Sequence, residues 1–273
     1  MDSKLIFQKH IFLPQDHGSW VFVFSPIIAG FNLGGWGAAQ AWIAFSAVAF
    51  FLLRQPLTVV VKALSGRRDR RDLPPSILWS SVYGVALISA IVGMILTGQT
   101  YVVYWMAAPA VLMLAWQFWM VVNRVERKQR TFEVLSTGLL AFIAAAMVWV
   151  KGKPFDTDGF ILWLFLFLQA AASIYYAYTR LEQRGWKNLP EIRARWDVSA
   201  GTLVFTGCNL IVAAWLGVMG LVGSLLWVAF TVQLLETIYS VNRPAMGFKP
   251  TAIGFRQLAV SVVFLALFLV FWK

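Results

Sequence analysis

The chain has 273 residues, of which 60% are hydrophobic and only 13% are charged, and its mean hydropathy is +0.71. This composition excludes a water-soluble domain of this length and indicates a polytopic membrane protein. The formal net charge of +11 does not indicate a nucleic-acid partner, because the basic residues lie in short loops between apolar segments and not on a soluble domain.

The apolar segments are continuous for about 18 to 25 residues, which is the length of a membrane-spanning helix and unlike the alternating pattern of a barrel strand. We therefore expect an all-α fold with nine transmembrane helices. No linker or change in composition divides the chain, so residues 1–273 are predicted to form a single domain. The predicted spans, in chain order, are residues 18–34, 38–63, 76–98, 102–123, 132–150, 159–180, 198–219, 222–241 and 252–272.

The Lys and Arg residues lie almost entirely on one side of this arrangement. Of 23 such residues, only Lys151, Lys153 and Lys273 fall on the side opposite to the N-terminus. Cytoplasmic loops are enriched in Lys and Arg, which is the positive-inside rule. We therefore expect a cytoplasmic N-terminus and, after nine crossings of the lipid bilayer, a C-terminus outside.

Three predicted helices carry polar side chains at helical spacing in the half nearest the cytoplasm. Residues three or four apart share one face of a helix, so each set forms a stripe. An ionisable group within a span is costly unless it faces protein or the interface, which makes each stripe a candidate site. The stripes are Arg54, Thr58 and Lys62 beside Gln55 and Pro56 in the second helix, Gln169, Ser173, Tyr176 and Arg180 in the sixth, and Gln233, Glu236, Ser240 and Arg243 in the eighth.

Two interpretations of the stripes are open. Each stripe could be a hydrogen-bonded seam between helices, with its terminal Arg pointing at lipid headgroups. Three stripes at similar depth instead favour one shared cavity that opens to the cytoplasm. Glu236 needs a nearby cation, because a buried carboxylate without one is costly. The available cations are Arg54, Lys62, Arg243 and Arg256. Glu236 is either a member of a salt bridge or a catalytic group.

Two segments at the cytoplasmic ends of helices add further candidates. Leu13-Pro14-Gln15-Asp16-His17-Gly18-Ser19-Trp20 leads into the first helix, where Asp16 suits a helix cap and His17 suits a proton acceptor or an anion contact. Arg130 and Glu133 lie at the mouth of the fifth helix, in either a solvated loop or a phosphate-binding wall. The chain has one cysteine, no cluster with metal-ligand spacing and no glycine-rich nucleotide motif, so we expect neither a metal nor a cofactor.

The chain resembles the YwiC-like family of bacterial membrane proteins, whose N-terminal signature is a Pro-x-acid-His-Gly-Ser-Trp run. The resemblance implies a multi-pass protein of the bacterial inner membrane whose activity is undetermined. The chain departs from the expected pattern at Arg256, where an acidic residue would stand. The motifs that carry the resemblance are Leu13 to Trp20 with Pro26 and Gly30, Arg54-Gln55-Pro56, the Arg130 and Glu133 pair, and Lys249 to Arg256.

More remotely, nine helices with long cytoplasmic loops after the second and the sixth are similar to the UbiA-type intramembrane prenyltransferases. Those enzymes hold magnesium on a prenyl diphosphate with two Asp-rich motifs, and carboxylates are the hard ligands that magnesium requires. This chain lacks both motifs and has cations in their place, in Lys62 to Arg71 and in Tyr178 to Arg184. Metal-dependent ionisation of a diphosphate is therefore not expected.

The leading hypothesis is a UbiA-like bundle with a cytoplasm-facing polar cavity that binds an anionic or isoprenoid lipid without a metal. Phe- and Trp-rich walls would hold the lipid tail, while cations neutralise the headgroup. The candidate ligand-binding residues are Arg54, Gln55, Lys62, Arg67, Arg130, Glu133, Tyr176, Arg180 and Arg243.

Two alternatives belong to other functional classes, so whether the protein is an enzyme is left open. The first is a metal-independent transferase acting on a lipid diphosphate, with His17 or Glu236 as the catalytic base. The second is an accessory subunit of a larger bioenergetic or photosynthetic membrane complex, in which the abundant Trp and Phe side chains would contact protein and pigment.

Overall fold

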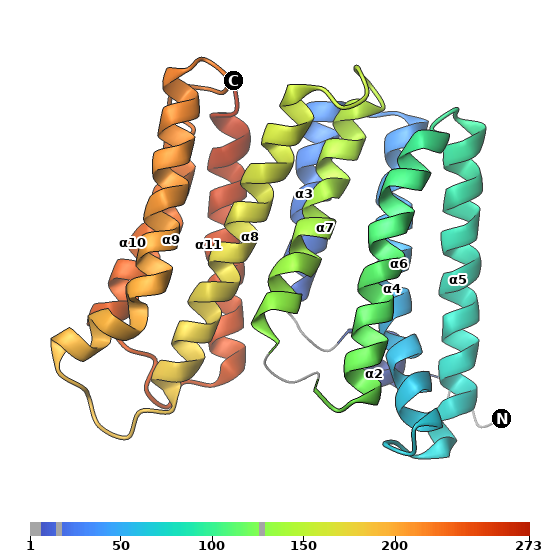
Figure 1. The fold of residues 1–273 in the computed structure, drawn as a ribbon, viewed down its shortest axis with the longest axis horizontal. Helices are drawn as coiled ribbons and strands as arrows, with labels where there is room; N and C mark the ends of the chain where they lie inside the picture. Colours follow the sequence, from blue (N-terminus) through green and yellow to red (C-terminus); the bar gives the residue numbers. More distant parts are fainter. Residues whose placement is uncertain (1–6, 15–17, 126–128) are drawn as a thin grey trace.

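The computed structural model describes residues 7–14, 18–125 and 129–273, and within these residues the chain is helical, without a strand. Nine long helices run up and down side by side (Figure 1). They are α3 (Ser19–Gly34), α4 (Ala38–Leu64), α5 (Leu73–Leu96), α6 (Thr100–Val122), α7 (Arg130–Trp149), α8 (Thr157–Arg184), α9 (Ile192–Val218), α10 (Trp227–Asn242) and α11 (Pro250–Val270). The short helices α2 (Lys9–Phe12) and η1 (Arg70–Asp72) lie at the lower end of the bundle in Figure 1.

Each predicted span corresponds to one of the long helices, with differences at the ends. Helix α9 begins at Ile192, six residues before the predicted span, because Arg193, Arg195 and Asp197 interrupt the apolar segment without ending the helix, and these first turns are mostly exposed. Helix α10 begins at Trp227, five residues later than predicted, and the preceding Gly223 donates its N–H to the carbonyl of Trp272 at 2.8 Å. The loop before α10 therefore packs on the end of α11.

Seven of the long helices in the described part of the chain have the length and hydropathy of membrane spans. The other two, α3 and α10, have 16 residues each. At a rise of 1.5 Å per residue such a helix is about 24 Å long, which is somewhat short of a hydrocarbon core of about 30 Å. The chain is thus a multi-pass membrane protein.

The helices form two groups with separate hydrophobic cores. One core lies among α8 to α11, where Phe230 and Phe264 pack edge to face with ring centres 5.1 Å apart. The other lies among α3 to α7 and contains Ile43, Phe51 and Met147. Helices α3 and α7 also contribute residues to the first core and pack against α11 and α8, so they form the seam between the groups.

At the upper end of this seam α3 and α7 approach each other very closely. A Cβ atom added to Gly34 would lie 2.5 Å from the carbonyl oxygen of Met147, so only glycine fits there. The buried Gln40 of α4 donates its amide to the carbonyl of Gly34 at 3.1 Å and to that of Met147 at 3.4 Å. Small residues that bring backbones together are a common basis of helix packing in membranes. This contact fixes how α3, α4 and α7 meet.

Candidate functional site

The polar stripes of α8 and α10 meet inside the α8–α11 group, and α11 joins them. Gln169 donates its Nε2 to Oε1 of Gln233 at 3.2 Å, and Gln257 of α11 donates to the same oxygen at 2.7 Å. Gln257 also donates to the Ser173 hydroxyl at 2.7 Å. All four side chains are buried, so these bonds satisfy polar groups that would otherwise be costly in lipid.

One turn further along α8 and α10, Glu236 forms a salt bridge. Arg256 donates Nε to Oε1 at 2.5 Å and Nη2 to Oε2 at 2.9 Å, and the Tyr176 hydroxyl donates to Oε1 as well. The guanidinium of Arg256 also lies 4.4 Å from the ring centre of Tyr239. In this structure Glu236 is therefore held in an ion pair, and Arg256, where the family pattern led us to expect an acid, supplies its cation.

Arg180 lies at the lower end of α8 and binds the end of α10. Its Nη1 donates to the side chain of Gln183 at 2.9 Å and to the carbonyls of Ser240 and Arg243 at 3.4 and 2.7 Å. The last carbonyls of a helix lack partners within it and carry the negative end of the helix dipole. Arg180, which is only 1% exposed, thus caps α10, while the side chain of Arg243 is exposed.

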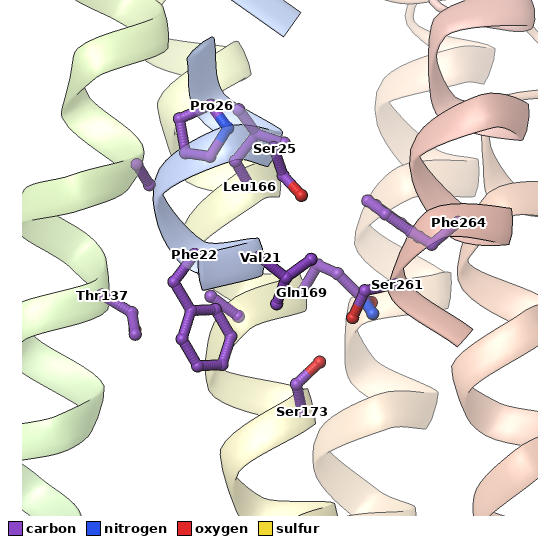
Figure 2. Close-up of a pocket in the computed structure, with 12 residues that line it drawn as sticks. Val21, Phe22, Ser25, Pro26, Thr137, Leu166, Gln169, Ser173, Ser261 and Phe264 are labelled. Carbon is purple, nitrogen blue, oxygen red and sulfur yellow. The ribbon is translucent and has the colours of Figure 1, made fainter. Parts of the chain in front are cut away.

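A small pocket lies beside this network, where α3, α7, α8 and α11 come together (Figure 2). Its volume is about 30 Å³. Figure 2 shows Ser25 of α3, together with Gln169 and Ser173 of α8, pointing into the space between α3 and α11. The polar residues of its wall are Ser25, Thr137, Gln169, Ser173 and Ser261.

The stripe of α4 does not join the other two. Arg54 lines a different pocket of about 40 Å³ between α4, α6 and α7, whose other polar lining residues are Gln117 and Ser136. The Thr58 hydroxyl donates to the carbonyl of Arg54 at 2.8 Å and accepts from Gln117 at 2.9 Å. Helical period defines the face of a stripe but not the neighbour that it meets. The single cavity expected from three stripes is therefore corrected to two separate sites.

Other predicted ligand-binding residues of α4 hold adjacent segments. Gln55 donates to the backbone carbonyl of His10 at 2.8 Å, which ties α2 to α4. Arg67 donates Nη1 to the carbonyl of Val121 and so joins the loop after α4 to the end of α6. Lys62 lies in the last turn of α4. The candidate base His17 lies outside the described residues.

Arg130 and Glu133 both contact Tyr178 of α8. The guanidinium of Arg130 lies 4.7 Å from the ring centre of Tyr178, and Glu133 accepts a hydrogen bond of 2.9 Å from its hydroxyl. These contacts join the lower ends of α7 and α8. The pair therefore has a defined structural role at this end of the bundle.

Gln257 and Ser261 of α11 were not among the residues predicted from the sequence. They are four residues apart and share one face of the helix, so this spacing of two polar residues in an apolar segment was the available signal. Among the residues that the structure describes, no three His, Cys, Asp or Glu side chains lie close enough together to share a metal ion.

A family model described as YwiC-like protein matches residues 13–151, which is just over half of the chain. The matched segment runs from the Leu13 to Trp20 motif to the end of α7, and so it includes the Arg54 pocket and ends before α8. The comparisons with curated proteins and with solved structures gave no match.

Proposed function

This chain belongs to the YwiC-like family, and we propose that it crosses the bacterial inner membrane nine times, with α2 on the cytoplasmic side. Helix α2 and the C-terminus lie at opposite ends of the bundle, as an odd number of crossings requires (Figure 1). Loops at the α2 end carry the Arg-rich segment Arg67–Arg71, whereas Lys151 and Lys153 lie at the other end. This distribution supports a cytoplasmic α2 end. Thinning of the bilayer would accommodate the shorter α3 and α10.

We further propose that the protein binds an anionic lipid, of phospholipid or isoprenoid type, at the Arg54 pocket and without a metal. The observation that carries this proposal is a cation in the middle of a membrane helix, lining a pocket whose other walls are mostly apolar. An ionisable group within a membrane span is costly and is usually functional, which makes Arg54 a candidate binding residue. The apolar lining residues are Phe50, Phe51, Met113, Leu114, Phe132, Leu139 and Leu140.

The chemistry of Arg54 suits a lipid headgroup better than it suits a hydrocarbon tail alone. A guanidinium can donate two parallel hydrogen bonds to phosphate oxygens, and these bonds are stronger than neutral ones. A pocket of about 40 Å³ has room for only part of a headgroup, so the chains would lie along the lipid-facing surface beside it. Lys62, Arg67 and Arg130 belong to the same helix group and lie nearer to its lower end. They would attract the anion from the cytoplasmic leaflet.

Lipid analysis of purified protein tests this proposal. The wild type should retain an anionic lipid through washing with detergent, and Arg54→Gln should reduce the amount retained about tenfold or more, since a charge-assisted hydrogen bond contributes about 1.5–3 kcal/mol. Arg193→Gln is the matched control, because Arg193 is an exposed cation on α9, outside the pocket. The mass of the lipid distinguishes a phospholipid from an isoprenoid phosphate. Equal retention by all three proteins would contradict the proposal.

We propose binding rather than transfer because the candidate base Glu236 belongs to the other helix group. Glu236 is engaged by Arg256 and Tyr176 within the α8–α11 group, whereas α4 packs against α3, α5, α6 and α7. Proton transfer requires hydrogen-bond reach or one bridging water. Turnover of a lipid diphosphate by the purified protein that is lost in Glu236→Gln would instead favour a transferase.

A further inference from the structure

Each of the four helices around the pocket in Figure 2 contributes at least one polar side chain to a wall that is otherwise apolar. Gln169 and Ser261 lie near the middle of α8 and α11, and Ser25 lies near the middle of α3. Four helices from both groups surround it, so it interrupts the seam. Polar side chains at a seam between membrane helices normally pair with one another across it, so a polar atom there without a partner points to a bound ligand.

The amide network next to the pocket is incomplete. The atoms Oε1 of Gln169, Nε2 of Gln233 and Oε1 of Gln257 are buried and have no hydrogen-bond partner in the described protein. Reversing the three amides would exchange donors and acceptors but would again leave three atoms without partners, because one Gln233 atom serves both neighbours. Each such group costs about 1–3 kcal/mol if nothing satisfies it. Of these three residues Gln169 lines the pocket, so a small ligand there would satisfy its unpartnered atom.

We propose that this pocket binds ordered water, one or two molecules, in the middle of the membrane. A cavity needs about 10–15 Å³ for one water and two to four polar partners around it, and this pocket offers about 30 Å³. Gln169, which is buried and has an unpartnered oxygen, lines it together with the hydroxyls of Ser25 and Ser261. Water takes part as donor and acceptor, which is what a mixed set of amides and hydroxyls requires.

The lining residues favour water over an ion. Among the residues that the structure describes, no Asp, Glu, Lys or Arg lines the pocket, so a bound ion would have no countercharge from them at a depth where that is very costly. The nearby carboxylate of Glu236 is already paired with Arg256. The water site and the Arg54 pocket share only helix α7, and they take different ligands. The water site therefore does not depend on the proposed lipid binding.

Radiolytic footprinting of the full-length protein tests the proposal. X-rays split bound water where it lies, and the hydroxyl radicals oxidise adjacent side chains even when bulk solvent cannot reach them. Phe264 lines the pocket and is 2% exposed, whereas Phe268, one turn further along α11, is 0% exposed and packs in the aromatic core. We expect Phe264 to be oxidised at least several-fold faster than Phe268. Equal rates for the two rings would overturn the proposal.

Two variants connect the labelling to the pocket. Gln169→Leu removes the polar wall, and Ser261→Val fills the space, so either should bring the oxidation rate of Phe264 down to that of Phe268. Gln117→Leu is the control, because this buried amide lies in the other helix group, and it should leave Phe264 unchanged. If Gln169→Leu does not fold, Ser261→Val decides alone. Unchanged oxidation in a folded pocket variant refutes the water site, whatever lipid the protein retains.

Discussion

The salt bridge between Glu236 and Arg256 gives the sharpest test of the α8–α11 packing. Glu236 has a side-chain exposure of 11% and Arg256 one of 36%. Two unit charges 4 Å apart attract by about 4 kcal/mol at an effective dielectric constant of 20. Because Arg256 is more than a third exposed, screening should reduce the measured coupling to about 2 kcal/mol.

A double-mutant cycle measures this coupling. We expect Glu236→Gln and Arg256→Gln each to lower the free energy of unfolding by about 2 kcal/mol, since each leaves one charge without its partner. The double variant should lose little more than either single one, so the coupling energy equals about one single effect. Reversible unfolding in mixed detergent micelles, followed by helical circular dichroism, gives the four free energies.

The exposed pair Lys273 and Asp158 is the matched control. Its side chains are 54% and 46% exposed, so the cycle Lys273→Gln with Asp158→Asn should give a coupling below about 0.5 kcal/mol. A coupling between Glu236 and Arg256 that is no larger than that of this control pair would refute the assignment of a partly buried, stabilising ion pair to α10 and α11.

Two further predictions concern packing and capping. Gly34→Ala should lower the free energy of unfolding by about 1–3 kcal/mol, because its Cβ would lie 2.5 Å from the Met147 carbonyl oxygen. Gly84 of α5 has open space around it, so Gly84→Ala should be neutral or slightly stabilising in the same micelle assay. Arg180→Met should lower the free energy of unfolding by about 2–3 kcal/mol, because it leaves the last carbonyls of α10 without a donor. Arg184 is more exposed, so Arg184→Met should lower it by less than half as much. Equal losses for the two variants would argue against the capping role.

The positions of the nine long helices followed from the sequence because apolar segments of this length have few alternatives in lipid. Their ends were less accurate, since α9 continues in polar residues that hydropathy assigns to a loop. The pairing of the α8 and α10 stripes also followed, because both place their polar face at the same depth.

The position of the Arg54 stripe could not be predicted from spacing alone. The helical period shows that Arg54, Thr58 and Lys62 share a face, but the neighbour of that face depends on how α4 packs. The Arg54 end of this face meets α6 and α7 instead of α8 or α10. Gln257 was missed because a single amide in an apolar helix gives little signal, although its two neighbours Ser173 and Gln233 give it its role.

The close contact between Gly34 and Met147 has a mechanical consequence. The two backbones touch at the upper end of the seam, and Gln40 fastens both carbonyls there. Lower down, the same seam has side chains between its helices, which can change rotamer more easily than a backbone can move. The upper ends of α3, α4 and α7 should therefore move as one unit, and a relative tilt of the two helix groups would take place where α3 and α7 pack on α11 and α8.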